Sequence, residues 1–225
     1  MADTCVSRVP VFAGLSEDDQ RTVAGLARST RLTAGELAYS AADERSRLIV
    51  LHTGHLKIFR LSADGAEQIV RVLGPGEFTG ETSILTGRSP ADYAAAMDDC
   101  QVCVFRHEDL EALIRQHPGI GMRMLATVSE RLAVTERRLT SLTSHGVESR
   151  VADYLLSLPA TRRDGVATVD LPMAKKDVAS LIDTTPESLS RALTSLAAQG
   201  LISVGAGRSI SITQPAPLQR LSDGA

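Results

Sequence analysis

The sequence predicts an α+β protein in which a β-roll (jelly roll) is followed by one long helix and then by a winged helix-turn-helix. Three patterns support this prediction: short apolar runs separated by turn residues between 30 and 106, an unbroken helical pattern after 118, and a helix–turn–helix–hairpin order after 146. We therefore expect domains at residues 1–117, 118–145 and 146–225. A chain of 225 residues is long enough to bury more than one core.

The composition is that of a soluble globular protein, with 43% hydrophobic and 23% charged residues. No apolar run approaches the ~20 residues that cross a bilayer, and "MADTCVSRVP" lacks the features of a signal peptide. We therefore expect a cytoplasmic protein without a membrane partner. The three cysteines, Cys5, Cys100 and Cys103, are an odd number, which argues against a structural disulfide framework in a reducing compartment.

The β-roll is predicted from strand-like runs at roughly ten-residue spacing, as in small antiparallel barrels and sandwiches. The runs are separated by Thr53-Gly54, Asp64-Gly65 and Gly74-Pro75-Gly76. Asp-Gly between alternating segments indicates a hairpin, because a positive φ costs little there. A short helix over 16–27 is expected before the roll, with Ser16 as its N-cap.

A long helix is expected next, because no Gly or Pro interrupts residues 122–144. Apolar positions spaced 3, 4, 3, 4 and 3 residues apart are typical of a coiled-coil seam, here with one polar member. The predicted seam consists of Leu125, Val128, Leu132, Thr135, Leu139 and Leu142. This seam predicts a homodimer, and the alternative is a long helix packed on its own domain.

The last part of the chain begins with an amphipathic segment, "VESRVADYLLSL", and then "RRDGV", which we expect to form a turn. In "MAKKDVASLI", the residues Val178, Leu181 and Ile182 recur at the spacing of one helix face. This segment is therefore the expected first helix of a helix-turn-helix.

The second helix of that motif is expected directly after Asp183-Thr184. Thr185 can cap it, and Pro186 suits its first position, where no amide hydrogen is required. Gly200 ends the helix, and residues 201–213 form a short hairpin with a Gly-rich turn. Two helices joined by a short turn and followed by a hairpin are typical of proteins that read the DNA major groove.

These motifs together resemble the Crp/Fnr superfamily of bacterial transcription regulators over nearly the whole chain. The stretch "GHLKIFRLSADGAEQIVRVLGPGEFTGE" is similar to the glycine-punctuated strands of that family, and "PESLSRALTSLAAQGLIS" to its recognition helix and wing entry. The resemblance implies a cyclic-nucleotide-binding-like β-roll as sensor, a dimerisation helix and a DNA-binding domain. It also implies double-stranded DNA, a second copy of the chain and RNA polymerase as partners.

The recognition helix reads Glu187-x-x-Ser190-Arg191, which resembles the Fnr-like branch and implies half-sites of the TTGA kind. Pro186 stands where the cyclic-AMP receptor branch usually has Arg. Arg191 can contact guanine O6 and N7 together, Glu187 can accept from a base amino group, and Ser190 can reach a neighbouring base. The alternative is that this polar face is only solvated. Asp183 occupies a turn position where Gly is usual, and Asp tolerates left-handed backbone better than most residues.

The bulk charge gives no support to DNA binding. The net charge is −3, and residues 150–225 hold eight Lys/Arg against seven Asp/Glu, so DNA binding must depend on where the charges lie. Contacts to DNA phosphates fix the position of a protein on the duplex, but they do not read the base sequence. The candidate phosphate contacts are Lys175, Lys176, Thr185, Ser188 and Arg208.

Cyclic-nucleotide-binding members of the family share Gly-Glu for the ribose and Arg-Ser-Ala for the cyclic phosphate. This chain keeps Gly80 and Glu81, but Arg88-Ser89 stands two positions early, which is expected to point the guanidinium elsewhere. Thr135 matches the helix position that reaches the adenine, with Glu136 rather than Ser beside it. These residues are the candidate effector pocket, and a cyclic-nucleotide-responsive regulator stays an alternative.

The Fnr-like branch often senses oxygen through an iron–sulfur cluster held by three N-terminal cysteines and a fourth in the roll. Cys103 falls where that fourth ligand is expected, but Cys5 is the only cysteine before the roll. Another thiolate-bound metal, completed by Asp98 or Asp99, is a further candidate. Cys100 and Cys103 would point to opposite faces of a regular strand and chelate together only across a bulge. The alternative for Cys103 is plain core.

Haem is a third candidate cofactor, because some cysteine-poor Fnr-like regulators bind it. The candidate ligands are His52, His55, His107, His117 and His145. The alternative for each of them is a surface or capping role. The sequence shows no P-loop, nucleophile elbow or spaced His/Glu metal pair, so we do not expect an enzyme. The alternative to a regulator is a ligand-binding module without DNA output.

Overall fold

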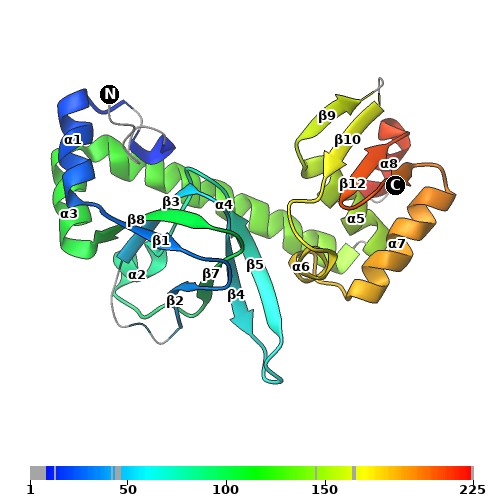
Figure 1. The fold of residues 1–225 in the computed structure, drawn as a ribbon, viewed down its shortest axis with the longest axis horizontal. Coiled ribbons are helices and arrows are strands. Elements are labelled where there is room, and N and C mark those ends of the chain that lie inside the picture. The colour runs from blue at the N-terminus through cyan, green and yellow to red at the C-terminus, as the bar shows by residue number, and fades with distance from the viewer. Residues whose placement is uncertain are drawn as a thin grey trace. The chain divides into compact units, whose positions relative to one another are not determined.

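The computed structural model describes residues 9–12, 14–41, 43, 47–144, 146–163 and 166–223, without the side chains of 137, 138 and 140–144. It forms two compact units, Met1–Arg131 and Leu132–Ala225 (Figure 1). The division falls inside the long helix α4 (Pro118–Ser144). The sequence predicted domain limits at residues 117 and 145, which would make the long helix a part of its own. These limits stay a prediction.

The first unit contains the predicted β-roll, built within the described residues from two four-stranded sheets of antiparallel pairs. The first sheet has the order β1-β8-β3-β6, with bounds Arg28–Leu32, Cys100–Arg106, Arg47–Thr53 and Phe78–Thr79. The second has the order β2-β7-β4-β5, with bounds Leu37–Tyr39, Tyr93–Ala96, Leu56–Leu61 and Glu67–Leu73. The fold class predicted from the sequence is confirmed.

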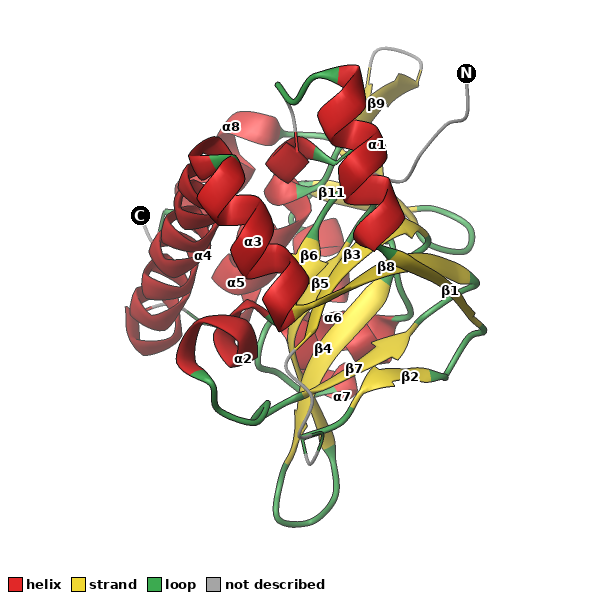
Figure 2. Cartoon of the chain, turned by 90° about the vertical axis from the view of Figure 1, so that its left-hand side faces the viewer, coloured by secondary structure: helices red, strands yellow, loops and turns green. Residues whose placement is uncertain are grey.

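Short helices accompany the roll, and Figure 2 shows α2 and α3 beside its strands. Besides the start of α4, they are η1 (Pro10–Phe12), α1 (Glu17–Leu26), α2 (Glu81–Thr86) and α3 (His107–Gln116). Ser16 caps α1, because its hydroxyl accepts a hydrogen bond from the Asp19 amide at 3.2 Å. The predicted first helix and its N-cap are therefore confirmed.

Side-chain alternation gives β3 two buried faces. Leu48 and Val50 point into an outer core, whereas Ile49 and Leu51 point into an inner core between the sheets. The outer core also contains side chains from α1, α3 and α4, namely Val23, Leu110, Leu113, Ile120 and Met124. Helices therefore cover one face of the first sheet, and the second sheet covers the other.

The predicted turns have the backbone that their glycines permit. Gly54, Gly65 and Gly76 have φ angles of 85°, 82° and 89°. The amide of Gly65 donates to the Ser62 carbonyl at 2.9 Å, which closes the turn between β4 and β5. The Asp-Gly hairpin predicted from the sequence is confirmed.

The second unit contains the predicted winged helix-turn-helix. Its helices beyond α4 are α5 (Val147–Ser157), α6 (Lys175–Leu181), α7 (Pro186–Ala198) and α8 (Pro215–Ser222). Its sheet has the order β11-β12-β10-β9, with bounds Ile202–Val204, Ser209–Ile212, Val166–Asp170 and Ala160–Arg163. The hairpin β11–β12 is the wing expected over 201–213.

The chain reverses direction at "RRDGV", as predicted, because Arg163 at the end of β9 lies opposite Val166 at the start of the antiparallel strand β10. The two strands themselves were not predicted. Strand β10 also pairs with β12, so that Val169 lies opposite Ile210 and both are buried. The pairing is non-local, and the short polar run gave no sign of it. The sequence reasoning also did not anticipate α8, whose Leu218 is fully buried.

Gly80 lies at the N-cap of α2 with φ of 89°, directly against the backbone of β3. A Cβ atom at this position would be 2.0 Å from the Arg47 carbonyl oxygen, which is far inside van der Waals contact. Glycine is therefore required here by both the backbone angle and the close approach of another strand.

We predict that Gly80→Ala lowers the free energy of unfolding by more than the ~1–2 kcal/mol that a left-handed alanine costs alone, because β3 must also move. Gly65→Ala is the matched control, since Gly65 has φ of 82° and nothing within 4 Å of the added atom. Urea unfolding of both variants measures the difference. Equal losses in the two variants would contradict this description of Gly80.

Candidate nucleic-acid interface and sensor sites

The helix-turn-helix is formed by α6 and α7. The hydroxyl of Thr185 caps α7 by accepting from the Ser188 amide at 3.1 Å, and Pro186 occupies the first position, as predicted. Leu189, Leu193 and Leu196 bury the inner face of α7. The opposite face of the helix is therefore the one presented to solvent.

That outer face carries the three predicted base-contacting residues. Glu187, Ser190 and Arg191 are all exposed, and their spacing of three and four residues places them on one side of the helix. Arg191 Nη2 donates to the Ser188 hydroxyl at 3.2 Å, and Thr185 Oγ1 donates to the same hydroxyl at 3.1 Å. Thr185 and Ser188, expected as phosphate contacts, thus also cap the helix and orient Arg191.

The turn between α6 and α7 depends on Asp183, which has φ of 53° and is the only non-glycine residue with positive φ in the described part of the chain. Arg150 of α5 holds this turn, because its guanidinium donates to the carbonyls of Ile182 at 3.2 Å and Asp183 at 3.3 Å. Sequence reasoning missed Arg150. The sequence carried no clear signal for this role, because α5 also contains other charged side chains, Glu148 and Asp153.

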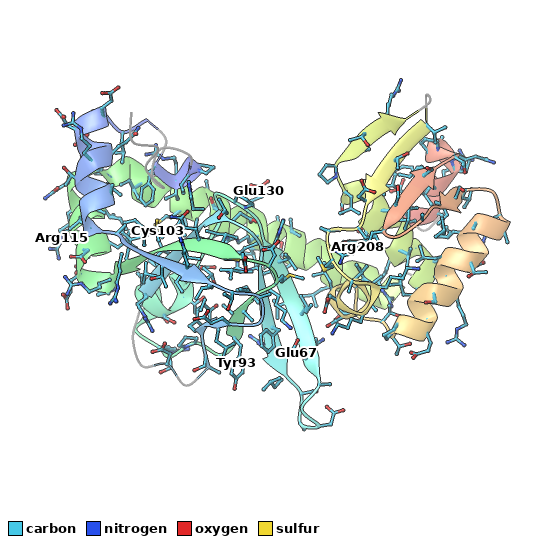
Figure 3. The ribbon with its side chains drawn as sticks, in the orientation of Figure 1. Glu67, Tyr93, Cys103, Arg115, Glu130 and Arg208 are labelled. Carbon is cyan, nitrogen blue, oxygen red and sulfur yellow. The ribbon has the colours of Figure 1, made fainter. Side chains whose placement is uncertain are left out.

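The remaining predicted phosphate contacts are also at the surface. Lys175 and Lys176 are exposed at the start of α6. Arg208 is exposed in the wing turn before β12 and donates to the Pro172 carbonyl at 3.4 Å (Figure 3). Cations thus lie at the start of the first helix and in the wing of this unit.

A polar cluster lies within the roll around Glu81. Glu81 Oε1 accepts from Arg71 at 3.1 Å and from Arg131 of α4 at 3.0 Å. Arg131 also donates to the Phe78 carbonyl at 2.9 Å. Burial, with the nearby Arg71, lowers the pKa of the Arg131 guanidinium. Glu81 Oε2 is buried without a hydrogen-bond partner among the described residues, so Glu81 has accepting capacity for a ligand hydroxyl.

The cluster continues through Thr79 to Tyr39. The Tyr39 hydroxyl is 2.9 Å from Thr79 Oγ1 and donates to Asp92 at 3.1 Å, and Arg71 donates to Thr79 at 3.2 Å. Burial raises the pKa of Tyr39, so this hydroxyl stays protonated. Sequence reasoning missed Arg71, Arg131, Tyr39 and Asp92, because they are distant in sequence and meet only through sheet pairing.

The other candidate effector residues lie outside this cluster. Arg88 and Ser89 are exposed after α2, and the cations that contact Glu81 are Arg71 and Arg131 instead. Thr135 and Glu136 are exposed on α4, in the second unit. The structure therefore does not bring Arg88-Ser89 to Gly80 and Glu81, as their early position in the sequence had suggested.

The predicted seam on α4 has an exposed apolar row. Leu125, Leu132 and Leu139, spaced seven residues apart, are 58%, 58% and 59% exposed. Val128 is half-buried and Thr135 is exposed, while the side chain of Leu142 lies outside the described residues. Leucines at this exposure on one face of a helix leave apolar surface that a partner can cover.

The two described cysteines do not share one site. Cys100 is free in the inner core, whereas Cys103, which is labelled in Figure 3, is disulfide-bonded and lies in the outer core. Their side chains therefore point to opposite faces of β8, and Cys5 lies outside the described residues. Burial raises the pKa of the Cys100 thiol. An iron–sulfur cluster or other metal held jointly by Cys100 and Cys103 does not fit this arrangement.

Two of the candidate haem ligands lie beside aspartate carboxylates. His55 Nδ1 is 2.8 Å from Asp98 Oδ2, and His117 Nε2 is 3.5 Å from Asp19 Oδ1. His145 lies outside the described residues. In the described part of the chain, no three His, Cys, Asp or Glu side chains converge on a point where a metal ion could be held.

Comparison with known proteins relates both units to established families. Residues 29–117 match the cyclic nucleotide-binding domain family, and residues 149–221 match the Crp-like helix-turn-helix domain family. The "Probable transcriptional regulator flp" of Lacticaseibacillus casei is 30% identical, with 90% of this chain and 91% of the relative aligned. The "Cyclic AMP receptor protein" of Thermus thermophilus is 27% identical, with 96% and 97% aligned.

Solved structures show the same architecture. FixK2 from Bradyrhizobium japonicum superposes with a TM-score of 0.75 at 25% identity, over 88% of this chain and 98% of that one. A CooA mutant from Carboxydothermus hydrogenoformans has a TM-score of 0.84 at 14% identity, over 96% of both chains, which supports the fold alone. No helix within the described residues is long and apolar enough to span a bilayer.

A sensor-type β-roll joined through a long helix to a winged helix-turn-helix defines a ligand-responsive class of DNA-binding transcription regulators. The chain belongs to the Crp/Fnr family of that class, as the sequence indicated. The two relatives reported above are named as a probable transcriptional regulator and a cyclic AMP receptor protein, and neither name is that of an enzyme.

Proposed function

We propose that this regulator acts as a homodimer that binds a two-fold symmetric DNA site with TTGA-like half-sites. The observation that carries the proposal is the exposed row Leu125, Leu132 and Leu139 on α4. A leucine that is fully removed from water stabilises by ~1.5–3 kcal/mol, so pairing this row with its copy in a second chain is favourable. A two-fold axis through the pair would place each residue near its counterpart.

The dimer contains two copies of the exposed residues Glu187, Ser190 and Arg191 of α7, one from each chain. Two recognition helices related by a two-fold axis read half-sites about one DNA turn apart, ~34 Å. Arg191 is held by Ser188 at 3.2 Å, which limits the side-chain entropy lost when the guanidinium binds guanine. We expect Glu187 and Ser190 to contact neighbouring bases, and Lys175, Lys176 and Arg208 to contact phosphates. Such a regulator would act in the cytoplasm together with RNA polymerase.

We infer a thiol redox signal as the input, on the observation that Cys103 is disulfide-bonded while Cys100 is free. Disulfides in reducing compartments are usually transient and redox-sensing rather than structural. Cys103 shares the outer core with Ile120 and Met124, which are on α4. A change at Cys103 therefore has a packed route to the helix that we assign to the dimer.

A cyclic nucleotide is the second candidate input, and the cluster around Glu81 favours it. Gly80 and Glu81 are kept, one buried Glu81 oxygen has no partner in the described residues, and Arg131 links Glu81 to α4. A ligand hydroxyl that donates to Glu81 Oε2 would bind to the same carboxylate that Arg131 contacts through Oε1, and would so act on that helix. The cation expected for a cyclic phosphate, Arg88, is exposed outside the cluster, which weakens this candidate.

A charged side chain in the seam on α4 tests the dimer. Leu132→Glu is expected to weaken dimerisation by about tenfold or more, because a charge enters the apolar seam without a partner. Sedimentation equilibrium over a range of protein concentrations measures the change. Leu61→Glu is the control, since Leu61 is 48% exposed on β4 and lies outside the seam. A Leu132→Glu protein that stays as dimeric as the Leu61→Glu protein would disprove the assigned seam.

Base recognition by Arg191 is tested by removing its side chain. Arg191→Ala is expected to lose ~1–3 kcal/mol of binding to a palindrome of TTGA-like half-sites and to discriminate the guanine less. Arg220→Ala removes the same charge from exposed Arg220 of α8 and should bind as the parent does. Fluorescence anisotropy at fixed salt measures both variants. An unchanged affinity and guanine preference for Arg191→Ala would refute the contact.

The thiol redox signal and the cyclic nucleotide can be distinguished by their effects on DNA affinity. DNA affinity is expected to change between dithiothreitol and a thiol oxidant, and to be unaffected by cyclic AMP. The redox response should vanish in Cys103→Ala and in Cys5→Ser, because Cys5 is the remaining cysteine of the sequence, and should persist in Cys100→Ala. A response to cyclic AMP with none to dithiothreitol would reject the redox proposal in favour of the nucleotide.

A further inference from the structure

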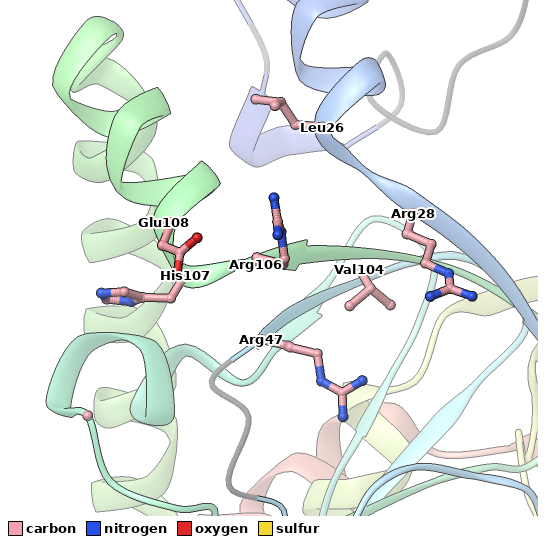
Figure 4. A pocket seen from close by; sticks show the side chains of 8 residues that line it. Leu26, Arg28, Arg47, Val104, Arg106, His107 and Glu108 are labelled. Carbon is pink, nitrogen blue, oxygen red and sulfur yellow. The ribbon is translucent and has the colours of Figure 1, made fainter.

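A cavity of about 650 Å³ lies at one end of the first sheet of the roll (Figure 4). Side chains of three neighbouring strands line it, together with residues from the ends of three helices. Its lining consists of Leu26, Arg28, Arg47, Gly87, Val104, Arg106, His107 and Glu108. None of these belongs to the Glu81 cluster, so the cavity is separate from the candidate effector pocket described above.

Strand register explains why the arginines share this cavity. Arg28 of β1 pairs with Val104 of β8, which also pairs with Ile49 of β3. Arg47 of β3 lies opposite Arg106 of β8 in the strand register. Arg47 is two residues from Ile49, and Arg106 is two residues from Val104. Arg28 and Arg47 therefore lie on the face of Val104 and Ile49, the inner face of the roll. The Arg106 side chain turns instead to the other side of β8, where it donates to Asp109 (Figure 4). In the described part of the chain, no second-sheet residue lines the cavity.

The arginines keep donors available for a ligand. Arg47 pairs with Asp43 at 2.5 Å and Arg106 with Asp109 at 3.0 Å. Each pair occupies only part of a guanidinium that carries five N–H donors. The Arg28 side chain is exposed and makes no hydrogen bond or ion pair with any described residue. The one acidic residue in the lining is Glu108.

The start of α3 adds further positive electrostatic potential to that of the arginines. Its N-cap is Arg106, which supplies no side-chain cap, so the first amide groups of the helix are not capped by a side chain. Two of the first residues of α3, His107 and Glu108, line the cavity. The positive end of a helix dipole favours an anion at this position. Leu26 and Val104 supply an apolar wall beside the cations.

We propose that this cavity binds a small molecule that carries a phosphate group on an apolar body. Guanidinium groups contact phosphate oxygens in bidentate fashion, and a cavity of about 650 Å³ has the size of ordinary small-molecule sites. Arg28 and Arg47, which flank Val104 in Figure 4, would hold the phosphate, and Leu26 and Val104 would contact the body. The inference does not depend on the proposed DNA site.

Isothermal titration of the full-length protein with phenyl phosphate tests the proposal, in a phosphate-free buffer at constant ionic strength. Saturable binding with a Kd of about 1 mM or below is expected, with inorganic phosphate weaker because it lacks the apolar body. Arg28→Gln should weaken binding about tenfold, and Glu108→Gln should strengthen it by removing a negative charge.

The matched control is Arg21→Gln, which removes the same charge from an exposed arginine of α1 that pairs with Asp18 and does not line the cavity. Its affinity for phenyl phosphate should equal that of the parent. The proposal is overturned if phenyl phosphate shows no saturable binding, or if Arg28→Gln binds as tightly as Arg21→Gln. Far-ultraviolet circular dichroism shows whether each variant is folded, and because this control does not involve DNA, the two proposals can fail separately.

Discussion

The architecture of the roll depends on one sheet, β1-β8-β3-β6, that is apolar on both faces. Alternating side chains of β3 put Val50 into the outer core and Ile49 into the inner core. A sheet of this kind needs a layer on each side. The second sheet provides one layer, and the helices provide the other. Because Ile120 and Met124 belong to the helical layer, the start of α4 is fixed to the sensor by the same packing that forms its core.

The polar groups of the roll lie near the ends of this sheet, where its two faces are no longer both buried. Glu81 follows the short strand β6, and Arg28, Arg47 and Arg106 lie toward one end of the first sheet. Both sites contain arginines, but in one of them Arg71 and Arg131 contact the carboxylate of Glu81, whereas the other has the exposed Arg28 in its lining. In the second unit, Arg150 has a comparable role, since it satisfies two carbonyls of the turn that sets the direction of α7.

The features that the sequence predicted are local ones. The Ser16 cap, the Asp64-Gly65 hairpin, the Thr185-Pro186 helix start and the unbroken α4 each depend on residues close together in the chain. The features that it missed depend on non-local pairing. Strand β10 pairs with β12, and Arg71 meets Glu81 only when β5 and the start of α2 come together in the roll. Cysteine spacing likewise showed that Cys100 and Cys103 face apart, but not that Cys103 is disulfide-bonded.

The central claim is that α4 pairs two chains so that two copies of Glu187, Ser190 and Arg191 bind DNA together. Its most direct test is the affinity for symmetric sites whose half-sites are separated by increasing spacers. The account predicts tight binding at one spacing near a full turn, ~34 Å, and a large loss when about five base pairs are inserted, because one recognition helix then faces the wrong side of the duplex. An affinity that does not vary with the spacer, or that equals the affinity for a single half-site, would contradict it.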